Sequence, residues 1–171
     1  MSFFLKRRYK KLGREFTKSL REELIAQGHV ARGTLRDSIR AEVKTSKSGE
    51  NTLLIRANKK WRAVNDGQPA GLNLSEQQIK TWLSAKNVNW RSYKFVIYQI
   101  NKAVFEQGTP TKGSFRYSKN GRRTGFVDQV ANKFKLRMLK DTREAVTLDF
   151  RNRFEKMIDK VVMKNKNLKR R

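Results

Sequence analysis

Residues that could carry out chemistry are few in this chain and widely scattered. Histidine occurs once, at His29, and cysteine is absent, so neither a zinc ligand set nor a Cys–His nucleophile pair is available. We interpret His29 as a turn or capping residue. The aspartates show no spacing typical of a catalytic pair or a two-metal site, although acids distant in sequence can still meet in space: Asp37, Asp66, Asp128, Asp141 and Asp149.

Motifs for cofactors and nucleic acids are also missing. Gly33, Gly67 and Gly71 do not compose a phosphate-binding loop. The three tryptophans, Trp61, Trp82 and Trp90, are better interpreted as core or interface anchors than as a stacking platform for bases. No zinc finger, aromatic sheet motif or two-glycine RNA clamp is present. The sequence therefore predicts a protein that is not an enzyme and that uses no metal or cofactor.

The composition is dominated by positive charge. The 171 residues include 41 Lys and Arg against 15 Asp and Glu, a net charge of +26. Such an excess favours a polyanionic or acidic partner, because it destabilises the free compact chain by self-repulsion. Residues 1–5 are too short a segment for a secretory signal, and no apolar run approaches a membrane span. We expect a soluble protein that is made in the cytoplasm of its host and has no membrane partner.

Basic residues gather at three places that we predict to contact a partner. The sites are the N-terminal helix, the polar loop 111–124 and the C-terminal tail 164–171, which we expect to be disordered. A solvated basic helix face and a merely flexible loop are the alternatives for the first two. The predicted contact residues are Lys6, Arg7, Arg8, Lys112, Arg116, Arg122, Arg123, Lys169, Arg170 and Arg171.

A β-hairpin within about residues 34–58 is the element around which the rest of the chain is organised. From Ile39 onward, apolar residues alternate with charged ones, as in a half-buried strand. Residues 46–50 supply turn chemistry, and residues 51–58 form a second run with the β-branched Ile55. The pattern predicts the only sheet of the protein.

Helical spacing predicts most of the remainder. One helix is expected over about 4–27, stopped by Gly28, and another is expected to start with a capping box at Ser75 and Gln78. A third, from about residue 91 to Gly108, is predicted to be the central buried helix, and residues 65–71 are predicted to be an irregular loop. Beyond Gly125 we expect either two helices or one kinked helix, because residues 141–144 carry a signal that could cap a second helix. The apolar stripe of this second segment consists of Val146, Phe150, Phe154, Met157, Ile158 and Val161.

These elements predict an α+β fold in a single domain spanning residues 1–171. It comprises a basic N-terminal helix at about 1–27, the hairpin core at about 34–58, a helical part at about 75–163 and the basic tail 164–171.

Several short segments resemble one known family in their order. A Gly-x-Leu-Arg-x-Ser-Ile run at 33–39 follows the first helix, and an aromatic residue begins the segment 61–67, which ends in glycine. A Trp-Leu pair at 82–83 and a Gly-Thr-Pro turn at 108–110 follow. Over roughly residues 20–130 the chain resembles the tail-completion, or head–tail joining, family of tailed-phage neck proteins. It departs from the family pattern at Arg32, at Gln68 and in its more extreme basic arms.

The resemblance implies a structural virion protein that forms a homo-oligomeric ring in the phage neck. Such a ring joins the capsid portal to the tail and surrounds the DNA channel. Its expected partners are other neck, portal-side or tail proteins, and any contact with genomic DNA is expected to be non-specific. The family-motif residues are Gly33, Leu35, Arg36, Ser38 and Ile39. We expect Gly33 to allow a tight turn, Leu35 and Ile39 to point into the core, and Arg36 and Ser38 to be free to bond a neighbour.

Two further expectations concern assembly. Because a lone hairpin is marginally stable, we predict that neighbouring subunits complete its edges. Because DNA must leave the channel, we expect most of the positive charge to face protein or the outer surface.

The main alternative function is sequence-independent nucleic-acid binding through Lys and Arg contacts to phosphates. The salt dependence of duplex DNA binding distinguishes the two, since a slope near zero removes this alternative. A small toxin-like or regulatory α+β protein is a weaker third option that nothing in the sequence demands.

Overall fold

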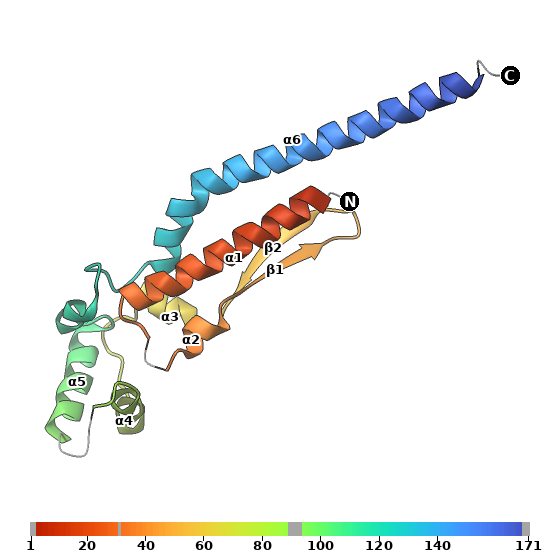
Figure 1. Ribbon diagram of the computed structural model, residues 1–171. Helices are drawn as coiled ribbons and strands as arrows, with labels where there is room; N and C mark the ends of the chain where they lie inside the picture. Colours follow the sequence, from red (N-terminus) through yellow and green to blue (C-terminus); the bar gives the residue numbers. More distant parts are fainter. Residues whose placement is uncertain (1–2, 31, 89–93, 169–171) are drawn as a thin grey trace.

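The fold is α+β, as predicted, with one hairpin and a series of helices. The computed structural model describes residues 3–30, 32–88 and 94–168. The long first helix α1 (Phe3–Ala26) packs against the hairpin and against the last helix α6 (Phe126–Leu168), so that it lies between them (Figure 1). A smaller unit of two helices, α4 (Glu76–Ala85) and α5 (Lys94–Gln107), lies at the far end of the molecule from the distal part of α6.

Helix α1 forms where the apolar spacing predicted it and ends at the predicted stop. Its residues Leu12, Leu20 and Leu24 are buried. Gly28 has a φ of 72°, and the amide of His29 donates a hydrogen bond to the carbonyl of Leu24 over 3.0 Å. A left-handed glycine just after the last turn therefore ends the helix.

The hairpin consists of β1 (Arg40–Thr45) and β2 (Asn51–Arg56), paired antiparallel from Arg40↔Arg56 to Thr45↔Asn51. No further strand of the described chain pairs with either edge. Helix α1 crosses the hairpin very closely, because a Cβ at Gly13 would lie 2.7 Å from the Cβ of Ala41. The expectation that 34–38 belongs to the hairpin was wrong, because this segment is a short helix, α2 (Thr34–Ser38), and the strand begins at Arg40.

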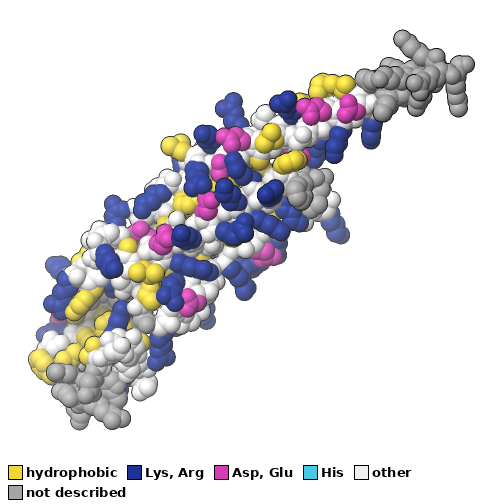
Figure 2. Space-filling view, viewed as in Figure 1, with side chains coloured by type: hydrophobic (Ala, Val, Ile, Leu, Met, Phe, Trp, Pro, Cys, Tyr) yellow, Lys and Arg dark blue, Asp and Glu magenta, His cyan; other side chains and the backbone are white. Residues whose placement is uncertain are grey.

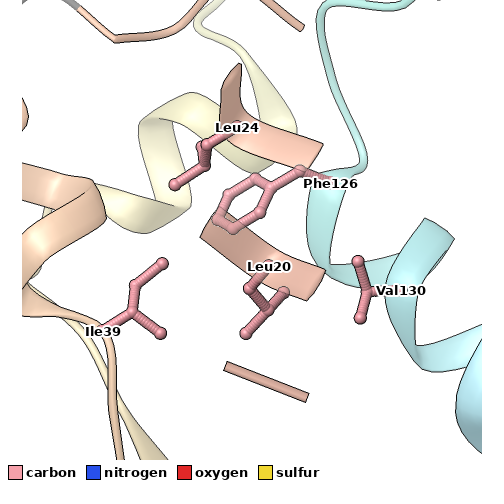
Figure 3. Packing of buried hydrophobic residues seen from close by; sticks show 5 residues of the cluster. All are labelled: Leu20, Leu24, Ile39, Phe126 and Val130. Atoms are coloured by element: carbon pink, nitrogen blue, oxygen red, sulfur yellow. The ribbon is translucent and has the colours of Figure 1, made fainter. Parts of the chain in front are cut away.

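The core joins three distant parts of the sequence. Leu20 and Leu24 of α1 pack with Ile39, before β1, and with Phe126 and Val130 of α6 (Figure 3). A second, smaller cluster of Ile79, Leu83 and Ile97 holds α4 to α5. Helix α5 is therefore not the central buried helix that the sequence predicted, because it buries one face against α4 and leaves large aromatic residues exposed.

The connecting segments are short helices and turns. The predicted capping box of α4 is present: the Ser75 hydroxyl accepts from the amide of Gln78, whose side chain accepts from the amide of Ser75. Helix α3 (Trp61–Asp66) extends two residues into the predicted loop 65–71. A 3-10 helix, η2 (Lys112–Tyr117), lies in the polar loop before α6.

Of the two alternatives predicted beyond Gly125, two helices or one kinked helix, the structure shows one helix, α6. It is a single helix of 43 residues that bends near its beginning and then runs past the N-terminal end of α1 (Figure 1). The capping signal at 141–144 does not start a new helix. Residues 164–168 of the predicted disordered tail continue α6, whereas Lys169, Arg170 and Arg171 lie outside the described residues.

Candidate assembly surfaces

Ion pairs fix α6 along the side of α1. They occur at three successive levels: Glu23–Lys133 at 3.7 Å, Glu15–Arg137 at 2.6 Å, and Arg8 with both Asp141 at 3.3 Å and Glu144 at 2.9 Å. The order is antiparallel, since α1 residues of decreasing number meet α6 residues of increasing number. Arg8, which we predicted to contact a partner, is therefore engaged within the chain, because two carboxylates of α6 lie against its guanidinium.

A basic groove opens between the same two helices near the N-terminus. It has a volume of about 380 Å³ and is lined by Phe4, Arg7, Arg8, Lys11, Arg14, Glu144, Ala145 and Leu148. Arg7, Lys11 and Arg14 are exposed, and no ion pair joins them to an acid in the described part of the chain. Lys6, the other predicted contact residue here, is half-buried. The groove thus holds three exposed cations that form no ion pair with an acid of the described residues.

Positive charge is not confined to this groove. Figure 2 shows Lys and Arg side chains distributed along the whole visible face, with fewer acids among them. Among the residues predicted in the polar loop, Lys112, Arg116 and Arg122 are exposed. The Arg116 guanidinium donates to the Tyr117 hydroxyl over 2.8 Å, and Arg122 bonds Gln129 of α6. These residues remain accessible to a partner.

Arg123 has a structural role instead. Its guanidinium donates to the carbonyl of Gln27 at the end of α1 (2.8 Å), and its carbonyl accepts a hydrogen bond from Nε2 of His29 (2.8 Å). Arg123, which we predicted to contact a partner, is therefore engaged within the chain, because its side chain closes the loop onto the C-terminus of α1. Burial, and then the nearby charge of Arg123, lower the pKa of His29 below its ordinary value. His29 is a turn residue, as interpreted from the sequence.

The family-motif residues serve the local fold. Ile39 is fully buried and Leu35 packs against the same cluster, as predicted. Gly33 has a φ of 76° at the start of α2, which is the conformational freedom expected of it. Arg36 and Ser38 are not free, because Arg36 Nε pairs with Asp37 (2.7 Å), while the Ser38 hydroxyl donates to Leu35 and accepts from the amide of Asn58.

Two segments on which the family resemblance depends lie in direct contact. The backbones of Gln68 and Thr109 exchange two hydrogen bonds of 2.8 Å each. A Cβ at Gly67 would lie 2.3 Å from the carbonyl oxygen of Thr109, and one at Gly108 would lie 2.2 Å from that of Gln68. Both positions therefore require glycine, which explains why each segment carries one.

Asn65 is a buried residue whose role the sequence did not reveal. Its Oδ1 accepts the amide hydrogen of Val127 (2.9 Å), and its carbonyl accepts from the amide of Gly125 (2.6 Å). The amides at the start of α6 have no intrahelical partner, so Asn65 caps α6 from α3. The only sequence signal at Asn65 is the Asp-Gly turn signal that follows it, and this signal does not predict a helix cap.

An exposed apolar stripe runs along α6, and we name it the α6 stripe. Its seven residues are Leu136, Leu139, Val146, Phe150, Phe154, Met157 and Ile158, all exposed. At 100° per residue they fall within an arc of about 120°, on the side of the helix opposite Val130 and Ala145, which are buried. The apolar spacing was predicted from residue 146 onward, but its exposure to solvent was not.

A second exposed surface lies on α5, and we name it the α5 aromatic face. It consists of Phe95, Tyr98 and Phe105, with Phe95 71% exposed. Trp82 on the neighbouring helix α4 is also exposed, whereas Trp61 packs against the main core. Trp90 lies outside the described residues. The α5 aromatic face and the distal α6 stripe occupy opposite ends of the molecule (Figure 1).

Comparisons with protein-family models, curated proteins and solved structures find no match to this chain. Within the described residues, no three His, Asp or Glu side chains are arranged to hold a metal ion, and no helix is both long and apolar enough to cross a membrane. The candidate sites are therefore surfaces: the basic groove, the α6 stripe and the α5 aromatic face.

Proposed function

We propose that this protein is a structural subunit of a tailed-phage virion, acting without enzymatic activity or cofactor. Its place is a homo-oligomeric ring in the neck, between the capsid portal and the tail. The observation that carries the proposal is the α6 stripe. Its seven exposed apolar side chains lie along one side of a helix, and apolar surfaces left exposed in this way mark protein–protein contacts.

The family resemblance supplies the location. The order of elements that suggested it is present in the fold: a first helix, the motif 33–39, a hairpin, a helix ending at Gly67, and a helix ending at Gly108. The contact between Gln68 and Thr109 supports treating the last two segments as one structural unit. Among the described residues no third strand pairs with either edge of the hairpin, in keeping with a subunit that is completed on assembly.

Quantitative mass spectrometry of purified particles tests the proposal. The copy number of this chain is scaled to that of the major capsid protein. A count of about six or about twelve per particle is expected for a closed ring. Absence from particles purified away from free protein and nucleic acid would overturn the neck assignment.

The basic groove favours sequence-independent nucleic-acid binding as the second candidate function. Arg7, Lys11 and Arg14 present three exposed cations along one side of α1 that pair with no acid of the described residues. Lys and Arg side chains of this kind contact phosphates without reading the base sequence. Affinity for duplex DNA should then fall steeply with salt, with a log–log slope of about −0.9 per phosphate neutralised.

A matched pair of variants tests this candidate. Changing Arg7, Lys11 and Arg14 to Gln should reduce the magnitude of the salt slope by as much as about 3. Changing the exposed Lys47, Lys59 and Lys60 to Gln removes the same charge elsewhere and should leave more of the slope intact. Equal losses in the two variants would show that net charge, and not the groove, attracts the DNA.

A further inference from the structure

The α6 stripe and the α5 aromatic face leave one subunit with two separate apolar surfaces. Helix α5 and the distal part of α6 lie at opposite ends of the molecule, so a subunit cannot cover its α5 aromatic face with residues 146–158 of its own α6 stripe (Figure 1). Beyond the N-terminal end of α1, the distal part of α6 has no neighbouring element of the described chain. Whatever covers these residues must therefore come from another molecule.

We propose that Phe150, Phe154 and Met157 on α6 of one subunit dock against the α5 aromatic face of a second copy. This interface deepens the proposed function, since it rests on assembly of like subunits, although not on the location of the assembly. A contact between two different surfaces of the same chain is head-to-tail, and its repetition closes into a ring when the rotation permits. Pairing of two α6 stripes would instead give a two-fold dimer and would leave the α5 aromatic face in water.

The distribution of charge favours a second copy as the occupant. Residues 136–160 carry seven Lys or Arg and five Asp or Glu, a net charge of +2, so the remaining residues carry +24 of the total +26. Local ion pairs at 2.9 Å, Asp149–Arg153 and Arg151–Glu155, neutralise the flanks of the stripe. On α5, Lys102 lies 3.9 Å from Glu106 beside the aromatic residues. The local charge at these two surfaces therefore adds little to the repulsion between two positive chains.

The dimensions and shape of the two surfaces also agree. Phe95 and Phe105 are ten residues apart, a span of about 15 Å along a helix, and Phe150 and Met157 are seven apart, about 10 Å, so the three docking residues fit within the length of the α5 aromatic face. The rings of Phe150 and Phe154 are stacked, with centroids 6.3 Å apart and planes 10° from parallel. This pair forms a ready apolar platform for the aromatic side chains of α5.

Charge-introducing variants of the full chain test the head-to-tail contact. The stripe variant carries Phe150→Glu and Met157→Glu, and the face variant carries Phe95→Glu and Phe105→Glu. All four side chains are exposed, and unchanged circular dichroism and thermal unfolding verify the fold of each variant. Light scattering coupled to size exclusion should show that each variant alone is monomeric, with self-association weakened about tenfold or more.

Mixing the two variants gives the decisive result. The stripe variant retains a face and the face variant retains a stripe, so the mixture should form one-to-one dimers and nothing larger. A control carrying Phe115→Glu and Tyr117→Glu adds the same charge at exposed aromatics of η2 and should assemble like the unchanged protein. The inference is overturned if the face variant alone self-associates normally, if the mixture stays monomeric, or if the unchanged chain is monomeric at every concentration.

The interface and the neck assignment fail in different experiments. Dimers in the mixture, together with absence from particles, would leave the interface standing and remove the phage neck. A copy number of about six or twelve in particles, together with a monomeric mixture, would keep the ring and move its contact elsewhere.

Discussion

The junction of α1 with the polar loop depends on a few polar residues around His29. Nε2 of His29 donates to the carbonyl of Arg123, whose guanidinium in turn donates to the carbonyl of Gln27. Protonating His29 places a second cation beside Arg123 in a partly buried position, and Lys86 adds to the repulsion. The junction is therefore built for a neutral imidazole.

This arrangement predicts a pH-dependent stability. Because the pKa of His29 is lowered by folding, the unfolded chain binds more protons once the pH falls below the ordinary histidine value of 6.5. The free energy of unfolding should then decrease as the pH falls from 7 to 5.5, by at most about 1.4 kcal/mol per pH unit. Urea unfolding of His29→Gln, which keeps an N–H donor, should show a flatter dependence over this range. Equal slopes would mean that other groups dominate the titration.

Gly13 makes a second prediction at the residue scale. Alanine normally stabilises a helix interior by about 1 kcal/mol relative to glycine. At Gly13, however, the added Cβ would meet the Cβ of Ala41 at 2.7 Å and Leu53 Cδ1 at 2.9 Å. Gly13→Ala should therefore destabilise the protein by about 1–3 kcal/mol through overpacking, as measured by chemical denaturation at one protein concentration.

Two comparisons verify this cause. Gly113→Ala has open space around the new Cβ and should change the free energy of unfolding by no more than about 0.5 kcal/mol. In the Ala41→Gly background, Gly13→Ala should cost less than it does alone, because the nearest contact is gone. A cost that is unchanged in that background would assign the strain to Leu53.

At the scale of elements, α6 depends on a cap provided by another helix. Asn65 accepts the amide of Val127 and donates from Nδ2 to Asp66 (2.7 Å) and Asp128 (3.3 Å). Asn65→Ala leaves the Val127 amide and the Asp128 carboxylate without this partner. The free energy of unfolding should fall by about 1–3 kcal/mol. The exposed Asn132→Ala on α6, the helix that Asn65 caps, should stay within about 0.5 kcal/mol. An equal loss there would mean that the Asn65 effect does not come from the cap.

Local signals in the sequence were enough to predict α1, the hairpin turn and the start of α4. Gly28, residues 46–50 and the Ser75–Gln78 pair act within a few residues of themselves, so spacing alone reveals them. The segment 34–38 was misjudged because Leu35 and the following Ile39 fit a strand entry as well as a helical turn. The hydrogen bond from the amide of Asn58 to the Ser38 hydroxyl joins residues 20 positions apart, beyond any local pattern. The cap at Asn65 joins residues 62 positions apart, beyond the reach of any local pattern.

The candidate site was less predictable than the fold. Apolar spacing on α6 and α5 identifies a helix face that avoids water, but it does not tell whether that face is covered within the chain. The α5 helix was therefore assigned to the interior and the exposure of the α6 stripe was not predicted, whereas the structure exposes both Phe95 and Phe150. The basic positions show the same limit, because Arg8 and Arg123 look like Arg7 and Arg122 until their partners on other elements are known.

At the scale of the whole molecule, assembly and nucleic-acid binding should respond to salt in opposite directions. A net charge of +26 repels a second copy, and raising the ionic strength from 0.1 to 1 M shortens the screening length from about 10 to about 3 Å. Contacts between apolar surfaces survive this change, whereas Lys and Arg contacts to phosphates weaken steeply. The weight-average mass of nuclease-treated protein should therefore rise with sodium chloride, while its affinity for duplex DNA falls. If the weight-average mass instead falls together with DNA affinity, ion pairs or residual nucleic acid hold the copies together. If the stripe variant at high salt has the same weight-average mass as the unchanged protein, the apolar contact lies outside α6.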